Sequence, residues 1–257
     1  MSDDLEVREV IKNIKHADDI YIYNFMPKFP KRLYEAFYDE LADLYYVHFE
    51  NKRIYIKRDY PFIIKNGNKY VQDIWYEQDT NSPHLYEYGD IKVCDGDVLV
   101  DAGVCEGNFS LHHIDKVKKV YLIECDDGWI EALRHTFAPY KDKVVFCNKY
   151  LSNVDSEERI SLDSLLSGEK ISFLKMDIEG EEINALNGAK KVLMASNGVK
   201  CSICSYHQHD DEKEINKILQ TYGMCTTTSK GYMLYLCDKY VCENPELRRG
   251  IVRGIMS

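Results

Sequence analysis

From residue 97 onward, apolar segments alternate with amphipathic stretches along the chain. Five segments have the length and apolar content of buried strands. They are DVLVDA (97–102), KVYLIE (119–124), KVVFCN (143–148), ISFLKMD (171–177) and KCSICSY (200–206). Two of the intervening stretches, 127–138 and 211–222, repeat apolar residues at helical spacing. Strands that alternate with helices predict a parallel sheet with helices on both faces, in the manner of a Rossmann-like α/β fold.

The end of this pattern differs from its start. MCTTTS (224–229) and YMLYLCD (232–238) both read as strands, and only Lys230-Gly231 separates them. Two strands joined by so short a turn must be antiparallel neighbours. We therefore expect a mostly parallel sheet that closes with an antiparallel C-terminal hairpin.

The first part of the chain follows another pattern. Apolar residues at helical spacing predict a helix near residues 7–14, and Pro30 followed by Leu33, Phe37, Leu41 and Leu44 predicts a second one. Residues 53–58 and 61–65 read as strands, and Asn66-Gly67 is a strong hairpin-turn signal. We divide the chain into an accessory part (1–92) of helices and a hairpin, a main domain (93–242) and a tail (243–257). The polar residues 77–84 serve either as a lid over the site or as a linker.

Composition excludes some classes of function. The net charge is −10 and the pI is about 5.3, which argues against a nucleic-acid partner. No apolar run approaches the roughly 20 residues of a membrane span, and the N-terminus lacks the apolar core of a signal peptide. The nine cysteines are scattered without framework spacing, as expected of free thiols in a reducing compartment. These features predict a cytoplasmic protein.

The segment VLVDAGVCEGNFS (98–110) is a strand that runs into a glycine-bearing turn. Gly103 and Gly107 lie four residues apart, unlike the dinucleotide fingerprint, whose second glycine admits a pyrophosphate. Cys105 occupies that position, and its side chain should obstruct a diphosphate. The turn therefore disfavours NAD and FAD and favours a cofactor without phosphate.

Glu124 ends the second strand, 23 residues beyond Asp101, where an acid accepts hydrogen bonds from ribose hydroxyls. A nucleoside cofactor without phosphate, bound by acids, suggests S-adenosylmethionine, whose sulfonium and ammonium groups are cationic. Asp101 would lie near its methionine part and Asn148 near its adenine. The predicted cofactor-binding residues are Asp101, Gly103, Cys105, Gly107, Asn108, Ser110, Glu124, Cys125, Asn148 and Asp177.

These segments resemble the FkbM family of S-adenosylmethionine-dependent methyltransferases. The resemblance covers residues 96–207 and extends to 238, and its most specific part is FLKMDIEGEEINALNGA (173–189). Family members carry a lysine, an aspartate and a glutamate-glycine-x-glutamate there, which correspond to Lys175, Asp177, Glu179, Gly180 and Glu182. The chain departs from the family pattern at Val104, Glu106 and Cys125. The resemblance implies a seven-stranded methyltransferase sheet with an antiparallel last strand, and a small-molecule or glycan hydroxyl as methyl acceptor, with a saccharide as the leading expectation.

Methyl transfer to a hydroxyl requires alignment of the reactants and a group that takes the hydroxyl proton. Asp177 and His207 follow the fourth and fifth strands, so they should share one edge of the sheet. In one mechanism, which we favour, His207 is the general base and no metal is needed. In the other, Asp177, Glu179 and His207 hold Mg²⁺ or Mn²⁺, which lowers the pKa of the acceptor. A non-catalytic binding protein and a nicotinamide-dependent oxidoreductase are the alternatives.

Overall fold

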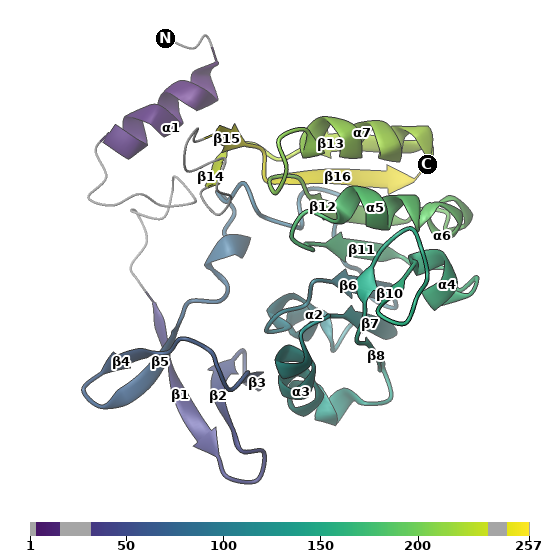
Figure 1. The fold of residues 1–257 in the computed structure, drawn as a ribbon. Helices are drawn as coiled ribbons and strands as arrows, with labels where there is room; N and C mark the ends of the chain where they lie inside the picture. Colours follow the sequence, from purple (N-terminus) through teal and green to yellow (C-terminus); the bar gives the residue numbers. More distant parts are fainter. Residues whose placement is uncertain (1–3, 16–31, 236–245, 257) are drawn as a thin grey trace.

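The computed structural model describes residues 4–15, 32–235 and 246–256, and a seven-stranded sheet forms its centre (Figure 1). In spatial order the strands are β13 (Met224–Thr228), β16 (Ile251–Met256), β12 (Lys200–Cys204), β11 (Phe173–Met176), β6 (Val98–Ala102), β7 (Lys119–Ile123) and β8 (Val144–Cys147). The five strands from β12 to β8 are parallel, and β16 is antiparallel to both of its neighbours. The predicted fold class, a mostly parallel sheet with an antiparallel C-terminal part, is confirmed.

The partner of β13 differs from our expectation. β13 pairs with β16, whereas residues 232–235, the described part of its predicted partner (232–238), do not join this sheet. The described part of that segment, β14 (Met233–Tyr235), instead pairs with β15 (Glu246–Arg248). Residues 251–256 belong to the predicted tail (243–257), yet Ile251 and Val252 are fully buried. Because β16 lies between β12 and β13, both of its edges are paired, and the arginine in its sequence concealed a central strand.

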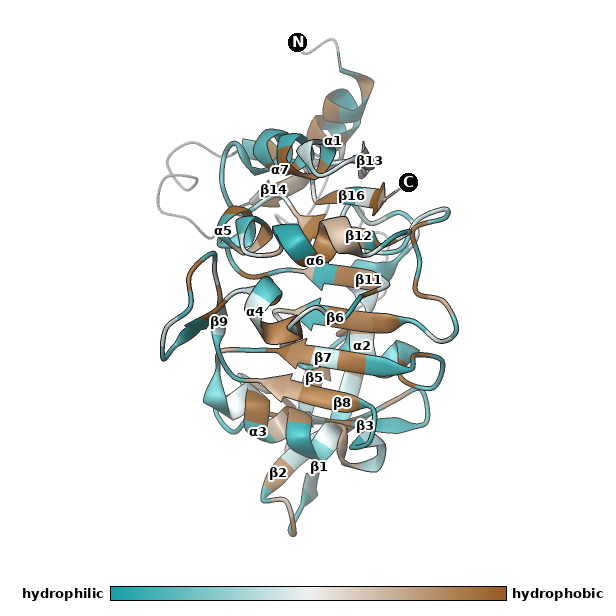
Figure 2. Cartoon of the chain, turned by 90° about the vertical axis from the view of Figure 1, so that its right-hand side faces the viewer, coloured by the Kyte–Doolittle hydropathy of each residue, from teal (hydrophilic) through white to brown (hydrophobic). Residues whose placement is uncertain are grey.

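Helices cover both faces of the sheet. One face carries α2 (Asn108–His113) and α3 (Asp127–Thr136), and the other carries α4 (Leu162–Leu166), α5 (Glu182–Asn187), α6 (Lys190–Ala195) and α7 (Asp211–Thr221). Figure 2 shows apolar residues concentrated in the strands behind α4, α5 and α6. The remaining short elements are the parallel pair β9 (Tyr150–Leu151) and β10 (Arg159–Ile160) and two 3₁₀ turns, Tyr76–Gln78 and Ala138–Tyr140. Nowhere in the described ranges does a helix reach the length and apolar content needed to cross a membrane.

The N-terminal part contains α1 (Leu5–Lys15), as predicted, and a second sheet. This antiparallel sheet has the order β3 (Lys52–Ile56), β2 (Leu44–Phe49), β1 (Leu33–Asp39), β5 (Asn68–Gln72) and β4 (Ile63–Lys65). The hairpin turn predicted at Asn66-Gly67 joins β4 to β5, and both turn residues have positive φ.

The predicted helix from Pro30 to Leu44 is wrong over its described residues, since residues 33–39 form β1 and residue 44 begins β2; Pro30 itself lies outside the described ranges. Tyrosine and phenylalanine favour strands, and Asp39 accepts hydrogen bonds from the backbone of Leu41 and Ala42. This Asx-type turn, together with the positive φ of Asp43, reverses the chain. Local turn chemistry therefore prevailed over an apolar spacing that also suits a helix.

The two sheets share one hydrophobic core. Buried residues of the N-terminal sheet, such as Ile54 and Val71, belong to the same apolar cluster as Leu99 and Leu133 of the main domain. Tyr55 also donates its backbone N–H to Thr136 on α3. This packing brings the connecting segment, residues 74–91, onto the main sheet at the end where its parallel strands terminate.

Candidate active site

The glycine turn after β6 lies directly against the end of β11. Gly103 has a positive φ, and a Cβ atom there would lie 1.6 Å from the carbonyl oxygen of Asp177. Only glycine allows this approach. The Lys175 ammonium donates hydrogen bonds to the carbonyl of Gly103 at 2.5 Å and to that of Ala102 at 3.3 Å. The turn is thereby fixed against the strand that carries Asp177.

Asp101 and Ser110, both predicted to bind the cofactor, lie buried beneath this turn. Asp101 is 3.1 Å from the Lys175 ammonium, its register neighbour on β11, and accepts a 2.6 Å hydrogen bond from the Ser110 hydroxyl. Burial lowers the pKa of Lys175, but Asp101 and Asp177 outweigh it and raise that pKa above its usual value. The arrangement supports the turn from below, and direct contact of Asp101 or Ser110 with a cofactor stays a prediction.

Glu124 links the two loops at the predicted cofactor position. Its carboxylate accepts hydrogen bonds from the backbone of Cys105 at 3.0 Å, of Cys125 at 2.8 Å and of Asp126 at 3.0 Å. The side chains of Cys105 and Cys125 are exposed on either side of it. Glu124 thus shapes both loops, and its Oε2, which accepts only the hydrogen bond from Cys105, retains acceptor capacity.

The other residues predicted to bind the cofactor lie at different places around this edge. Asn148 is exposed after β8 and donates to Asp127 at 2.5 Å. Asn108 donates to the carbonyl of Ile74 and so ties α2 to the connecting segment. Gly107 caps α2 with a positive φ, and a Cβ there would lie 2.7 Å from the Leu133 side chain.

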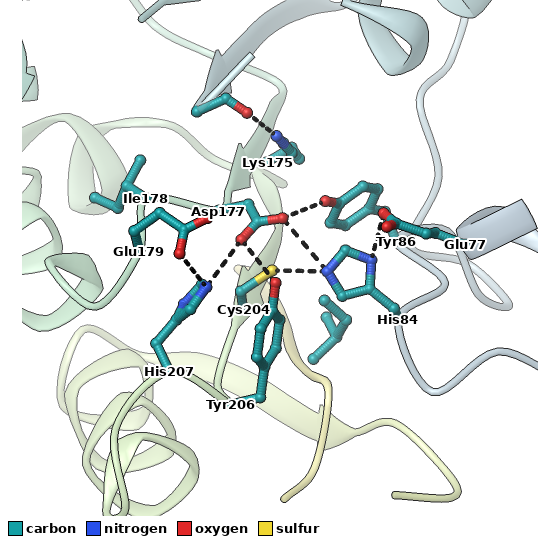
Figure 3. A network of polar contacts seen from close by, with 12 residues as sticks. Glu77, His84, Tyr86, Lys175, Asp177, Ile178, Glu179, Cys204, Tyr206 and His207 are labelled. Atoms are coloured by element: carbon teal, nitrogen blue, oxygen red, sulfur yellow. Dashed lines mark hydrogen bonds and ion pairs between the residues drawn. The ribbon is translucent and has the colours of Figure 1, made fainter. Parts of the chain in front are cut away.

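Asp177 is the centre of a polar network at this edge (Figure 3). Its carboxylate accepts hydrogen bonds from the hydroxyls of Tyr86 at 2.8 Å and Tyr206 at 3.2 Å. The Nε2 atoms of His84 and His207 lie 3.4 and 3.5 Å from its two oxygens. Burial alone would raise the pKa of Asp177, but His84, Lys175 and His207 hold it well below its usual value. The site therefore contains a fixed negative charge.

His207 lies among three carboxylates. Its Nδ1 is 3.0 Å from Glu182, and its Nε2 lies 3.5 Å from Asp177 and 3.6 Å from Glu179. Burial lowers the pKa of His207, but Glu182, Asp177 and Glu179 outweigh this effect and raise the pKa to about 9. Its side chain is only 1% exposed. At neutral pH the ring is a buried imidazolium.

Glu179 is the accessible carboxylate of the group. Its side chain is 85% exposed, and its backbone has a positive φ, which is uncommon for a residue with a side chain. The next residue, Gly180, also has a positive φ, and a Cβ there would lie 2.6 Å from the Gln208 amide. This bend after β11 directs Glu179 toward solvent while it stays within ion-pair distance of His207.

Two groups of side chains at the network have the geometry of metal ligands. They are Asp177, Glu182 and His207, and His84, Asp177 and Cys204, with the ligand atoms of each group within 4.8 Å of one another. We predicted Asp177, Glu179 and His207, so the tighter group contains Glu182 in place of Glu179. Mg²⁺ usually retains several waters, and the burial of Glu182 and His207 leaves little access for them.

The connecting segment contributes site residues that we did not predict from the sequence. His84 and Tyr86 both reach Asp177, and Glu77 lies 3.4 Å from Nδ1 of His84. We had treated residues 77–84 as a lid or a linker. The available signal was a histidine and a tyrosine two residues apart, which share one side of an extended chain. Tyr206, also missed, directly precedes His207, and the two rings are in contact at a tilt of 40° with centroids 4.1 Å apart.

Comparison with solved structures identifies the fold as that of a methyltransferase. A crystal structure of methyltransferase FkbM from Methylobacillus flagellatus KT has a TM-score of 0.51 at 21% identity, covering 65% of this chain and 45% of that one. The chain therefore spans less than half the length of that protein. It shares the Rossmann-like α/β fold of that methyltransferase.

The family comparison is more specific. Residues 151–232 match the model of the methyltransferase FkbM domain, which confirms the resemblance predicted from the sequence. A precorrin-6y C5,15-methyltransferase from Geobacter metallireducens GS-15 has a TM-score of 0.45 at 10% identity, covering 65% of this chain and 84% of that one. The Methanococcus jannaschii fibrillarin pre-rRNA processing protein has a TM-score of 0.48 at 13% identity, covering 89% of this chain and 95% of that one. A search of curated proteins found no significant match.

Proposed function

We propose that the protein is an S-adenosylmethionine-dependent methyltransferase that methylates a hydroxyl group of a saccharide or another small molecule. One observation carries this proposal. The Gly103 turn, the Glu124 carboxylate and the Asp177 carboxylate follow three neighbouring parallel strands and meet at one edge of the sheet. Ligands of open α/β sheets bind outside this edge.

The residues at this edge fit the cofactor. Glu124, Cys125 and Asn148 would hold its nucleoside, and the Gly103–Gly107 turn would hold its methionine part. Glu124 already orients both adjoining loops and has acceptor capacity left for ribose hydroxyls. The fixed charge of Asp177 suits a cationic ligand. When bound, S-adenosylmethionine supplies a methyl group on a sulfonium, which a nucleophile can attack directly.

Glu179 is the best placed residue to take the proton of the acceptor hydroxyl. It is exposed, whereas His207 is buried and already carries a proton at neutral pH. A general base must reach the proton that it removes and have a free lone pair to receive it. In this scheme His207 is a positioning residue that holds Asp177 and Glu179 through its positive charge.

This scheme needs no metal ion. The imidazolium of His207 already supplies a counter-charge to Asp177, Glu179 and Glu182, and an ion in the group of Asp177, Glu182 and His207 would have to displace its proton. The acceptor is proposed from the resemblance to the FkbM family, and the net charge of −10 argues against nucleic acid.

The cofactor assignment is tested by calorimetric titration with S-adenosylmethionine, its demethylated product and NAD⁺. The wild-type chain should bind the first two and not the third. Glu124→Gln should weaken both by about tenfold or more, because a carboxylate that holds two loops and the ribose is lost.

The matched control is Glu169→Gln, which removes the same charge at the opposite end of β7, where Glu169 pairs with Lys119. It should bind like wild type. Binding of NAD⁺ alone would favour the oxidoreductase alternative, and binding of none of the three would refute the proposal. Transfer of a labelled methyl group to a panel of glycosides then distinguishes an enzyme from a non-catalytic binding protein.

A further inference from the structure

A second cavity lies on the β13–β16 side of the molecule. It has a volume of about 1080 Å³ and is lined by residues of α1, of the loop 80–91, of β13 and the turn after it, and of β16. Ser82, Leu85 and Tyr88 of the loop line it, whereas His84 and Tyr86 of the same loop contact Asp177. The loop therefore separates this cavity from the candidate active site.

Arg253 of β16 lines the cavity and is only 3% exposed. Its guanidinium donates to two backbone carbonyls, those of Leu85 and Tyr86. Within the described ranges no carboxylate forms an ion pair with it, and Nη1 has no acceptor. Burial lowers the pKa of Arg253 to about 10, with only Tyr88 opposing the effect. A buried charge without a counter-ion is costly. An anionic ligand would supply the counter-ion that this arginine lacks.

Two buried serine hydroxyls in the same cavity also have unused donors. Ser82 is 6% exposed and accepts a hydrogen bond from the backbone of His84, and Ser229 is 4% exposed and accepts one from the backbone of Ile251. Neither hydroxyl donates to any described residue. A hydroxyl can donate one hydrogen bond besides those it accepts. Together with Nη1 of Arg253, these groups need an oxygen acceptor.

We propose that this cavity binds a small polyhydroxylated acid, with Arg253 as the counter-charge of its carboxylate or phosphate group. Charge-assisted hydrogen bonds from arginine to such groups are among the strongest in proteins. The exposed acids Glu9 and Asp90 also line the cavity and accept hydrogen bonds from ligand hydroxyls. Tyr88 offers an aromatic face beside the guanidinium, 5.4 Å away. A sugar acid or a sugar phosphate has all of these features.

The test is calorimetric titration of the full chain with glucuronate, glucose 6-phosphate and glucose. At least one of the two acids should bind, and glucose should bind at least tenfold more weakly. Binding of glucuronate alone identifies a carboxylate site, and binding of glucose 6-phosphate alone identifies a phosphate site. Arg253→Gln should lower the affinity for the acid by about tenfold or more.

Because Arg253 also holds the loop 80–91, a second variant keeps the test decisive if Arg253→Gln does not fold. Leu85→Trp fills the cavity and leaves both hydrogen bonds of Arg253 in place, since these use the backbone carbonyls of residues 85 and 86. It should also abolish binding. Arg134→Gln, the same charge change on α3, should bind like wild type. Failure of both acids to bind at millimolar concentration, or wild-type binding by the folded cavity variants, would overturn the proposal.

The inference is independent of the proposed function, because neither the cofactor nor methyl transfer enters the measurement. Glu124→Gln, which should lose the nucleoside cofactor, should bind the acid like wild type. If Glu124→Gln lost binding of both the cofactor and the acid, the acid would bind at the cofactor edge. That result would contradict the proposal that the acid binds in the cavity.

Discussion

Asp177 receives partners from two separate parts of the chain. Tyr86 and His84 come from the connecting segment, and Tyr206 and His207 follow β12. Four donors around one carboxylate stabilise its charged form, as its strongly lowered pKa indicates. A carboxylate that resists protonation is a poor general base but an effective fixed charge. Glu179, which extends from the same bend into solvent, is free of this restriction.

Glu179→Gln should reduce the turnover number for methyl transfer by about 10²–10⁴-fold, the usual contribution of a general base. The affinity for S-adenosylmethionine should stay near wild type, because the side chain is exposed and supports neither loop. Turnover is measured as transfer of labelled methyl into whichever glycoside the wild-type chain accepts.

Glu181→Gln is the control, since the Glu181 side chain is partly exposed and, among the described residues, contacts only Asn184 of α5 and, at 4.0 Å, Arg159. It should retain full turnover. If His207 were the base instead, Glu179→Gln would stay active and the wild-type rate would climb as pH rises toward 9, where His207 loses its proton.

The buried imidazolium of His207 should make stability depend on pH. Its pKa of about 9 in the folded chain exceeds the ordinary value of 6.5. The extra stability is therefore fully present below pH 6.5 and is lost as pH rises through about 9. The difference corresponds to about 3 kcal/mol at most. Urea unfolding at pH 6 and pH 9.5 should show this fall for the wild-type chain.

His207→Gln should remove most of this pH dependence, whereas His112→Gln, which alters a half-exposed ring beside Glu50, should retain it. Equal pH dependence in the wild-type chain and in His207→Gln would mean that other groups cause the fall and that His207 is not charged in the folded state.

At the scale of elements, the sequence predicted the parallel strands well. β6, β7, β8, β11 and β12 lie where five apolar runs placed them, because a strand buried on both faces must be apolar throughout. The positions of Glu124 and Asp177 could then be predicted as well, since the carboxyl ends of parallel strands lie at one edge of the sheet. The cofactor side of the candidate site could therefore be predicted from the alternation of apolar strands and helices.

Two of the described elements, β16 and β1, were mispredicted for different reasons: tertiary packing decides the burial of β16, whereas a local turn decides the conformation of β1. β16 contains Arg253, and an arginine normally indicates a surface position. Here its side chain is buried, because it lines a cavity and donates hydrogen bonds to two backbone carbonyls. β1 carries apolar residues that suit a helix as well as a strand, and the turn at Asp39 decided between them. His84 and Tyr86 were missed because only tertiary packing brings residues 77–86 to Asp177.

At the scale of the whole molecule, the N-terminal sheet and the main sheet are bound into one structure. Their buried apolar residues form a single cluster, and polar contacts such as the 2.9 Å ion pair between Lys57 and Asp126 join them at the surface. The active-site network itself crosses the boundary that we drew at residue 92, through His84 and Tyr86. A shared core predicts cooperative unfolding of both parts.

Calorimetry should therefore show one transition whose calorimetric and van't Hoff enthalpies agree. Ile54→Ala in β3 and Ile215→Ala in α7 remove fully buried side chains from opposite ends of the molecule, and each should cost about 2–5 kcal/mol. If the parts are coupled, both variants lower the midpoint of the same single transition. If the N-terminal sheet folds alone, Ile54→Ala shifts an early, separate transition and leaves the main one in place. The distinction matters for function, because loss of the N-terminal sheet would then release His84 and Tyr86 from Asp177 while the cofactor edge remained folded.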